Sequence, residues 1–200
     1  MQRIGLLGGT FDPPHIAHLV LADCAIESLG LDDLFFIPAA DPPHKQGDTR
    51  QSVEHRLHML ERALSVDTRF KLSLVDIERP GPHYTVDTVR LFGQQYPHAE
   101  LYFVIGSDSL RDLPTWYHPA ELVRLCKLAV MRRPDAEVPH DLDAAIMPGL
   151  AERVVFIDAP RLDISSTEIV ERLRQGKTVR YLVPDAVLTY IESGKIYLDS

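Results

Sequence analysis

The sequence GGTFDPPHIAH occupies positions 8–18 and directly follows a short apolar run, Ile4 to Leu7. The apolar run predicts a buried strand that ends at the two glycines, and the spacing of apolar residues from Leu19 to Leu29 predicts a helix that Gly30 ends. Glycines in a strand-to-helix turn let the backbone approach a phosphate closely and point its N–H groups toward it. This stretch therefore predicts an α/β fold whose first turn binds phosphate.

Two histidines in this stretch, His15 and His18, lie three residues apart, so both are expected on one face of the first helical turn. The same turn carries the positive end of the helix dipole, which favours anions. Two imidazole donors beside free backbone N–H groups suit the α- and β-phosphates of a nucleotide. The alternative is a plain turn with two surface histidines. A metal site is disfavoured because no Asp, Glu or Cys nearby completes a ligand set.

Apolar runs and helical patterns alternate along the rest of the chain. Further strands are expected at Leu34–Ile37, Leu72–Val75, Leu101–Ile105, Leu128–Met131 and Val154–Ile157. Further helices are expected at Val53–Leu64, Thr85–Gln95, Ser165–Arg174 and Asp185–Glu192, with loops over 38–51 and 133–149. This alternation predicts a doubly wound parallel sheet with helices on both faces, in a single domain over residues 1–200.

Ligands of such sheets bind at the carboxyl ends of the strands, near the point where the strand order switches. Gly8 and Gly9 end the first strand and Gly106 ends a later one, so we expect these glycines to meet at one crevice. Asp108 follows Gly106 and is placed to accept hydrogen bonds from ribose hydroxyls. Capping of a helix is its alternative role.

The composition is that of a soluble globular protein of 200 residues with a net charge of -8. An acidic surface repels nucleic acid and anionic membranes, so a site for ATP must be locally positive. No apolar run reaches the roughly 18 residues of a membrane span, and no signal peptide is apparent, so the cytoplasm is expected. Cys24 and Cys126 match no metal spacing and are expected to be reduced and inert. The composition favours no particular oligomeric state.

Positions 8–18 closely resemble the GGTFDPxHxGH motif of bacterial nicotinate-nucleotide adenylyltransferases, with Ala17 where the family usually has Gly. These proteins belong to the HxGH nucleotidyltransferase superfamily, which has a Rossmann-like α/β fold. The resemblance runs from about Arg3 to Tyr197. Its further motifs stand at Pro38–Lys45, His83–Thr88, Gly106–Leu110 with Trp116, Arg132–Pro134 and Ile164–Ile169. Two more departures are His83 for the common Ser and Val170 for the usual Arg.

The resemblance implies transfer of the adenylyl group of ATP, which carries Mg²⁺, to nicotinate mononucleotide, giving deamido-NAD and pyrophosphate in NAD biosynthesis. It implies catalytic roles for His15, His18 and Lys45. It further implies an ATP site made by Gly8, Gly9, Thr10, Phe11, His15, His18, Gly106, Asp108, Arg132, Arg133, Ile164, Ser165 and Ser166. Ser165 to Glu168 also has the pattern of a helix N-cap.

The site for nicotinate mononucleotide is expected at Lys45, Tyr84, Thr85, Trp116 and Tyr117. The backbone N–H of Thr85 at a helix start suits a carboxylate, and the indole of Trp116 suits a cationic pyridinium ring. An ordinary cap and a core tryptophan are the alternatives for these two residues.

Two other functions stay open from the sequence. One is a sister nucleotidyltransferase that acts on phosphopantetheine or nicotinamide mononucleotide, or uses a cytidylyl donor. The other is a nucleotide-binding regulator without catalysis, which Ala17 and Val170 favour. A class I aminoacyl-tRNA synthetase is disfavoured because such enzymes are much longer and carry a lysine-rich second motif.

Overall fold

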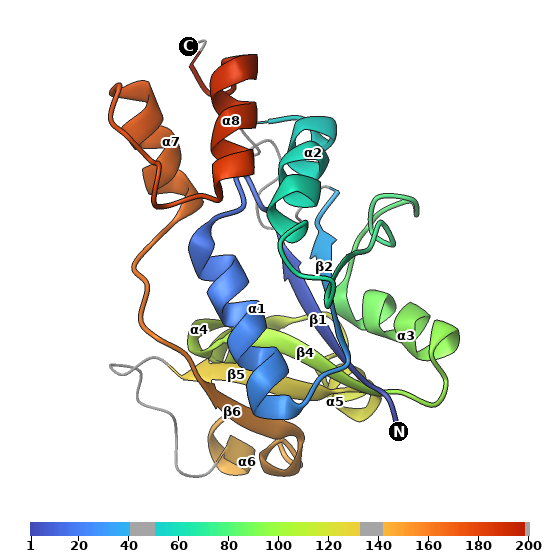
Figure 1. Ribbon diagram of the computed structural model, residues 1–200. Helices are drawn as coiled ribbons and strands as arrows, with labels where there is room; N and C mark the ends of the chain where they lie inside the picture. Colours follow the sequence, from blue (N-terminus) through green and yellow to red (C-terminus); the bar gives the residue numbers. More distant parts are fainter. Residues whose placement is uncertain (41–50, 133–141, 199–200) are drawn as a thin grey trace.

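A computed structural model describes residues 1–40, 51–132 and 142–198 of the chain (Figure 1). Six strands form one parallel sheet in the order β3-β2-β1-β4-β5-β6. The strands are β1 (Arg3–Gly9), β2 (Asp33–Pro38), β3 (Phe70–Leu72), β4 (Glu100–Gly106), β5 (Lys127–Arg132) and β6 (Val154–Asp158). This is the order of a Rossmann-like doubly wound sheet, whose switch point lies between β1 and β4. The predicted fold class is confirmed.

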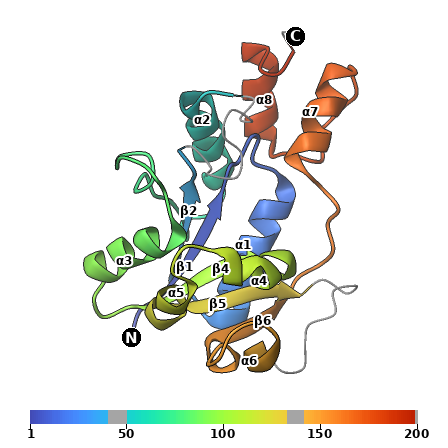
Figure 2. The same cartoon turned by 180° about the vertical axis from the view of Figure 1, so that it is seen from behind.

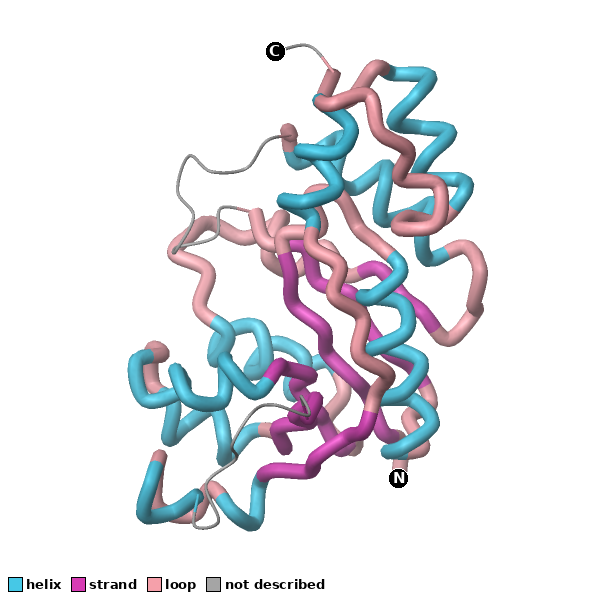
Figure 3. The backbone as a smooth tube through the Cα atoms, turned by 90° about the vertical axis from the view of Figure 1, so that its left-hand side faces the viewer, coloured by secondary structure: helices cyan, strands magenta, loops and turns pink. Residues whose placement is uncertain are grey.

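Helices cover both faces of this sheet. The helices are α1 (Ile16–Leu29), α2 (Val53–Leu64), α3 (Thr85–Gln95), α4 (Ser107–Asp112), α5 (Pro119–Leu125), α6 (Leu142–Ala145), α7 (Ser166–Arg174) and α8 (Asp185–Gly194). Two short 3-10 turns are η1 (Leu113–Thr115) and η2 (Ala151–Arg153). α1 lies over one face, and α3, α4 and α5 lie over the other, as the view from behind shows (Figure 2). Figure 3 shows the strands between these two helical layers.

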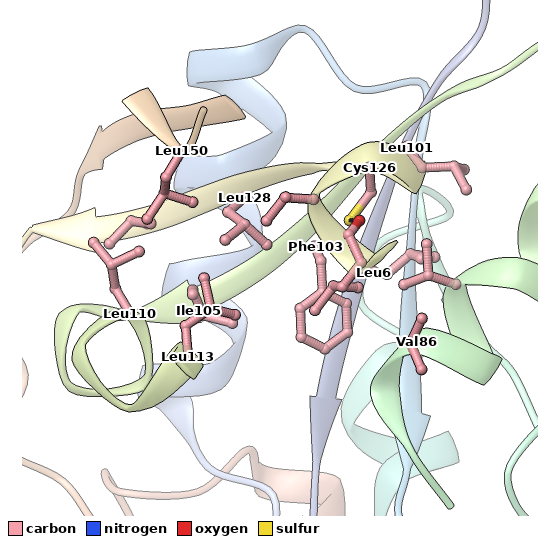
Figure 4. Close-up of a cluster of buried hydrophobic side chains, with 14 of the residues drawn as sticks. Leu6, Val86, Leu101, Phe103, Ile105, Leu110, Leu113, Cys126, Leu128 and Leu150 are labelled. Atoms are coloured by element: carbon pink, nitrogen blue, oxygen red, sulfur yellow. Dashed lines mark hydrogen bonds between the residues drawn. The ribbon is translucent and has the colours of Figure 1, made fainter. Parts of the chain in front are cut away.

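The alternation of side chains along the strands divides the core into clusters. Ile4 and Leu6 of β1 pack with Val86 of α3 and with β4 and β5 on one face (Figure 4). Leu7 packs with Ala22 of α1 on the other face. A third cluster lies away from the sheet and joins α2 to α7 and α8, through Met59, Ala63, Ile169, Val170, Val187 and Ile191. This third cluster attaches the C-terminal helices beside the carboxyl ends of β1 and β2 (Figure 1).

Several predicted boundaries are corrected by the structure. The strand expected at Leu72–Val75 is β3 at Phe70–Leu72, because its partner residues on β2 are Leu34 to Phe36 and the chain turns at Leu74. The apolar spacing of Val53, Leu57, Leu60 and Leu64 predicts the buried side of α2 only in part. Its buried residues are Arg56, Met59, Leu60, Ala63 and Leu64. The short helices α4, α5 and α6 were not predicted, and α6 lies inside the expected loop at 133–149.

Within the described part of the chain, the helices are too short or too polar to cross a membrane. The cytoplasmic location stays a prediction.

Candidate active site

The connection from β1 to α1 (residues 10–15, the β1–α1 loop) has a tightly constrained backbone. Phe11 has a left-handed φ of 51° and its side chain is buried. A Cβ at Gly9 would lie 2.8 Å from Cζ of Phe11, so only glycine fits where this ring folds back over the strand end. The Asp12–Pro13 peptide bond is cis. Of the two glycines predicted to shape a phosphate turn, Gly9 therefore lies where a side chain would displace the Phe11 ring.

His15 at the end of this loop and His18 in the first turn of α1 face each other. Their rings stack with centroids 3.6 Å apart and planes 19° apart. His15 was expected in the first turn of the helix. It is instead the N-cap, with an extended backbone, and α1 begins one residue later. The His15 N–H donates to Nδ1 of His18 at 3.1 Å. Since Nδ1 of His18 accepts, a neutral His18 ring carries its proton on Nε2 and can donate from there.

Burial keeps this pair uncharged. Desolvation lowers the pKa of His15 from 6.5 to about 4. Burial also lowers the pKa of His18 well below its ordinary value, and the nearby His15 lowers it further. Both rings are therefore neutral hydrogen-bonding groups near pH 7. An incoming polyanion would raise both pKa values, because an opposite charge favours the protonated form.

The ends of β1 and β4 meet as predicted. Leu6 of β1 pairs with Phe103 of β4, so Gly9 and Gly106, each three residues further on, end their strands at the same level. The Phe103 ring bounds the space beside Gly8, since a Cβ added to that glycine would lie 3.5 Å from Cζ of the ring. Beyond Gly106, Asp108 forms an ion pair with Arg111 in the exposed first turn of α4.

Aromatic side chains gather next to these strand ends. Trp116 is half-buried and its ring contacts that of Phe103 edge-on, with centroids 6.2 Å apart. The rings of Tyr84 and Tyr117 stack with centroids 4.1 Å apart and planes 22° apart. Tyr84 is the N-cap of α3 and Thr85 is its first residue, so the predicted helix start is confirmed. The Tyr84 ring thus connects the start of α3 to Tyr117.

An ion pair between Arg79 and Asp76 supports the start of α3. Arg79 and Asp76 are mostly buried, with side-chain exposures of 17% and 14%, and lie 3.0 Å apart. The Arg79 guanidinium also donates to the carbonyl oxygen of Tyr84 at 3.4 Å, and the Thr88 hydroxyl donates to Asp76 at 2.7 Å. This network fixes the first turn of α3, whose backbone N–H groups lack intrahelical partners.

The start of α7 reaches the β1–α1 loop. The Ser165 side chain accepts from the backbone N–H of Glu168 at 3.1 Å, so the N-cap expected here is present. The Ser166 hydroxyl donates to the carbonyl oxygen of Pro13 at 2.9 Å. Ile164, just before this start, is half-buried against the third cluster. These contacts bring the Ile164–Ser166 stretch to the loop, as the expected ATP site requires.

Three more cationic residues, Arg132, Lys45 and Arg133, were expected at the candidate site. The guanidinium of Arg132, at the end of β5, lies 4.9 Å from the centre of the Phe156 ring. Lys45 and Arg133 are outside the described residues. Within residues 1–40, 51–132 and 142–198, no three His, Cys, Asp or Glu side chains form a group that would hold a metal ion.

Two residues of this region were missed from the sequence, Asp12 and Arg56. Both are almost fully buried, with 3% and 1% of their surface exposed. Arg56 lies one turn before Met59 and Leu60 on the buried side of α2. A charged residue on an apolar helix face is the sequence signal that would have identified it.

This fold and site define a class: a Rossmann-like nucleotidyltransferase with a histidine pair at the first helix start. The Cytidylyltransferase-like family matches residues 6–172. The "Probable nicotinate-nucleotide adenylyltransferase" of Thermomicrobium roseum is 43% identical over 98% of this chain and 92% of that protein. The "Nicotinate-nucleotide adenylyltransferase" of Bacillus subtilis is 41% identical over 98% of this chain and 99% of that protein. The chain therefore belongs to the nicotinate-nucleotide adenylyltransferase family, as the motifs predicted.

A solved structure agrees in fold. The Plasmodium falciparum nicotinic acid mononucleotide adenylyltransferase complexed with NaAD has a TM-score of 0.80, at 19% identity, over 98% of each chain.

The lowered pKa of His15 predicts a pH dependence of stability. The unfolded chain takes up a proton as the pH falls through 6.5, whereas native His15 does so only near 4, so stability falls across this window. We expect the unfolding free energy of wild type to lose about 2 kcal/mol more than that of His15→Asn between about pH 7 and about pH 4.5. Urea unfolding at each pH measures this difference. The exposed His98→Asn should behave as wild type, and equal slopes for all three proteins would contradict the prediction.

Proposed function

We propose that this chain transfers the adenylyl group of ATP to nicotinate mononucleotide, giving deamido-NAD and pyrophosphate. The observation that carries this proposal is the stacked His15–His18 pair at the start of α1, with the aromatic group of Tyr84, Trp116 and Tyr117 beside the neighbouring strand end. A phosphate site and an aromatic site at one switch point suit a reaction between two nucleotides.

The reaction we propose is a direct in-line transfer. An oxygen of the mononucleotide phosphate forms a bond to the α-phosphorus of ATP while the bond to the bridging oxygen of the β-phosphate breaks, and pyrophosphate leaves. The second pKa of a phosphate monoester is near about 6, so the nucleophile is already dianionic and needs no general base. The protein then contributes position and stabilisation of charge.

The residues of the β1–α1 loop and of α7 would hold ATP. His18 would donate from Nε2 to phosphate oxygens, and its orientation is set by the hydrogen bond from the His15 backbone. The surrounding backbone and hydroxyl groups would come from Gly8, Gly9, Thr10, Phe11, Ser165 and Ser166. The ribose would bind near Gly106 and Asp108. The rest of the nucleotide would be surrounded by Ile164, Arg132 and Arg133. Lys45 would bind phosphate from the segment that follows β2.

Magnesium would enter as part of the ATP substrate. Mg²⁺ keeps several waters and is commonly held by substrate phosphates with few protein ligands.

Recognition of the acid form of the mononucleotide would depend on α3. The N–H groups at its first turn, including that of Thr85, suit a carboxylate, and the Arg79 guanidinium, paired with Asp76, holds the Tyr84 carbonyl at this helix start. Trp116 and Tyr117 would hold the cationic pyridinium ring.

The first experiment measures pyrophosphate release from ATP and Mg²⁺, with nicotinate mononucleotide and, in parallel, with nicotinamide mononucleotide. We expect fast release with the acid and slow release with the amide, because the amide offers no negative charge to α3. Release with the amide alone, or with phosphopantetheine, would assign a sister activity. ATP binding without release from any of the three acceptors would identify a regulator.

A catalytic role of His18 predicts a loss of turnover. His18→Asn keeps an acceptor for the His15 N–H but removes the Nε2 donor, so kcat should fall about 100- to 1000-fold with little change in ATP affinity. Steady-state kinetics and ATP titration measure the two effects. Unchanged kcat in this variant would exclude the role.

A ring-binding role of Trp116 predicts an effect on one substrate only. Trp116→Ala should raise KM for nicotinate mononucleotide about 2- to 30-fold and leave KM for ATP nearly unchanged, because a cation over an aromatic face is lost. Trp116→Phe should retain most of the affinity. A rise confined to the KM for ATP would refute the assignment.

A further inference from the structure

A buried guanidinium joins the ends of two neighbouring strands. Arg56 of α2 donates to the carbonyl oxygens of Thr10 at 2.9 Å, Ala39 at 2.8 Å and Ala40 at 3.3 Å. Thr10 follows β1, and Ala39 and Ala40 follow β2. One side chain therefore sets the distance between the β1–α1 loop and the segment that leaves β2.

A buried carboxylate completes this arrangement. Asp12 of the β1–α1 loop accepts a hydrogen bond from the backbone N–H of Gln51 at 3.3 Å, and one from the hydroxyl of Tyr197. Tyr197 is 4% exposed and lies just beyond α8, in a left-handed conformation with φ of 71°. The C-terminal part of the chain is thus hydrogen-bonded to the middle of the β1–α1 loop.

The charges of Arg56 and Asp12 connect these two sets of hydrogen bonds. Burial lowers the pKa of Arg56, and the negative charge of Asp12 opposes that shift. An arginine stays protonated in proteins, so α2 carries a buried cation with Asp12 as its counter-charge. Charges in such positions add little to stability compared with apolar residues of similar size, and they are retained in some proteins because they specify one geometry.

That geometry concerns the candidate active site. Thr10 and Asp12 belong to the β1–α1 loop itself, and Ala39 and Ala40 belong to the segment that follows β2. Ser166 of α7 holds the same loop at Pro13. A small rotation of the loop would move the N–H groups of Gly9 to Phe11 and the His15–His18 pair together. Misplacement by about 1 Å is enough to reduce turnover strongly.

We propose that Arg56 is a positioning residue, which with Asp12 and Tyr197 forms a clamp that holds the β1–α1 loop in the shape required for adenylyl transfer. This inference rests on the proposed function for its kinetic consequence. The clamp itself can be tested without any substrate.

The test uses Arg56→Lys, Tyr197→Phe and the control Arg62→Lys in the full chain. Lysine keeps the charge but lacks the planar fork that spans carbonyls of two segments. Arg62 lies on the same helix and donates to the His58 carbonyl within α2, away from the loop. Amide hydrogen exchange of residues 8–18, thermal unfolding, and kcat and KM for both substrates are measured.

We expect Arg56→Lys to lower kcat about 10- to 100-fold with KM for ATP within about threefold of wild type, and to speed exchange in residues 8–18. Tyr197→Phe removes one oxygen. It should also lower kcat and speed exchange in residues 8–18, but by less than Arg56→Lys does. The effects of the two should not add in the double variant, because both act on one loop. Arg62→Lys should match wild type.

The outcomes separate the clamp from the function. One result would be that Arg56→Lys lowers the unfolding temperature and yet leaves kcat and the exchange of residues 8–18 unchanged. That result would show that Arg56 is only structural and would overturn the proposal. If Arg56→Lys does not fold, Tyr197→Phe decides by the same readouts. If wild type releases no pyrophosphate, the proposed function fails, and the exchange data still decide whether the clamp exists.

Discussion

Pairing of β1 with both β2 and β4 is the constraint on which the candidate site depends. All three strands are parallel, so their carboxyl ends lie at one edge, and the connections leave β1 and β4 toward opposite faces of the sheet. The connections to α1 and α4 therefore both begin at this edge of the sheet. In open parallel sheets, nucleotide ligands bind at such a switch point.

An ATP site would have to attract anions although the protein carries a net charge of -8. The buried histidines supply hydrogen-bond donors without a fixed charge, and Arg56 supplies a fixed charge that is directed to backbone carbonyls. Backbone dipoles at the helix starts add positive potential, whereas the charge of Arg79 is balanced by Asp76. Free protein consequently avoids unpaired buried charge, while a bound polyphosphate shifts the histidines toward protonation.

The sequence predicted regular elements where local patterns and tertiary burial agree. Thr85–Gln95 was placed correctly because an amphipathic pattern follows a clear start, and the paired glycines marked the end of β1. Phe70–Leu72 was misplaced because a three-residue edge strand is fixed by its partner β2 and hardly by its own residues. The positions of His15, His18 and Tyr84 at helix starts were predictable because sequence motifs contain these residues. Asp12 and Arg56 act through partners more than 15 residues away, which no local pattern specifies.

Val170 shows how the C-terminal helices bear on the same loop. It stands where the family usually has Arg, and it is fully buried in the cluster that joins α7 to α2 and α8. Its methyl groups therefore contribute to docking of α7, and α7 in turn brings Ser166 to the carbonyl of Pro13. The segment between α7 and α8 supplies the Leu182 carbonyl to the first N–H of α1, at 2.9 Å. Valine in place of arginine thus exchanges a cation for apolar contact in the element that supports the β1–α1 loop. Because Arg56, Ser166 and Tyr197 reach that loop from α2, α7 and the end of α8, its shape depends on how firmly these helices pack together.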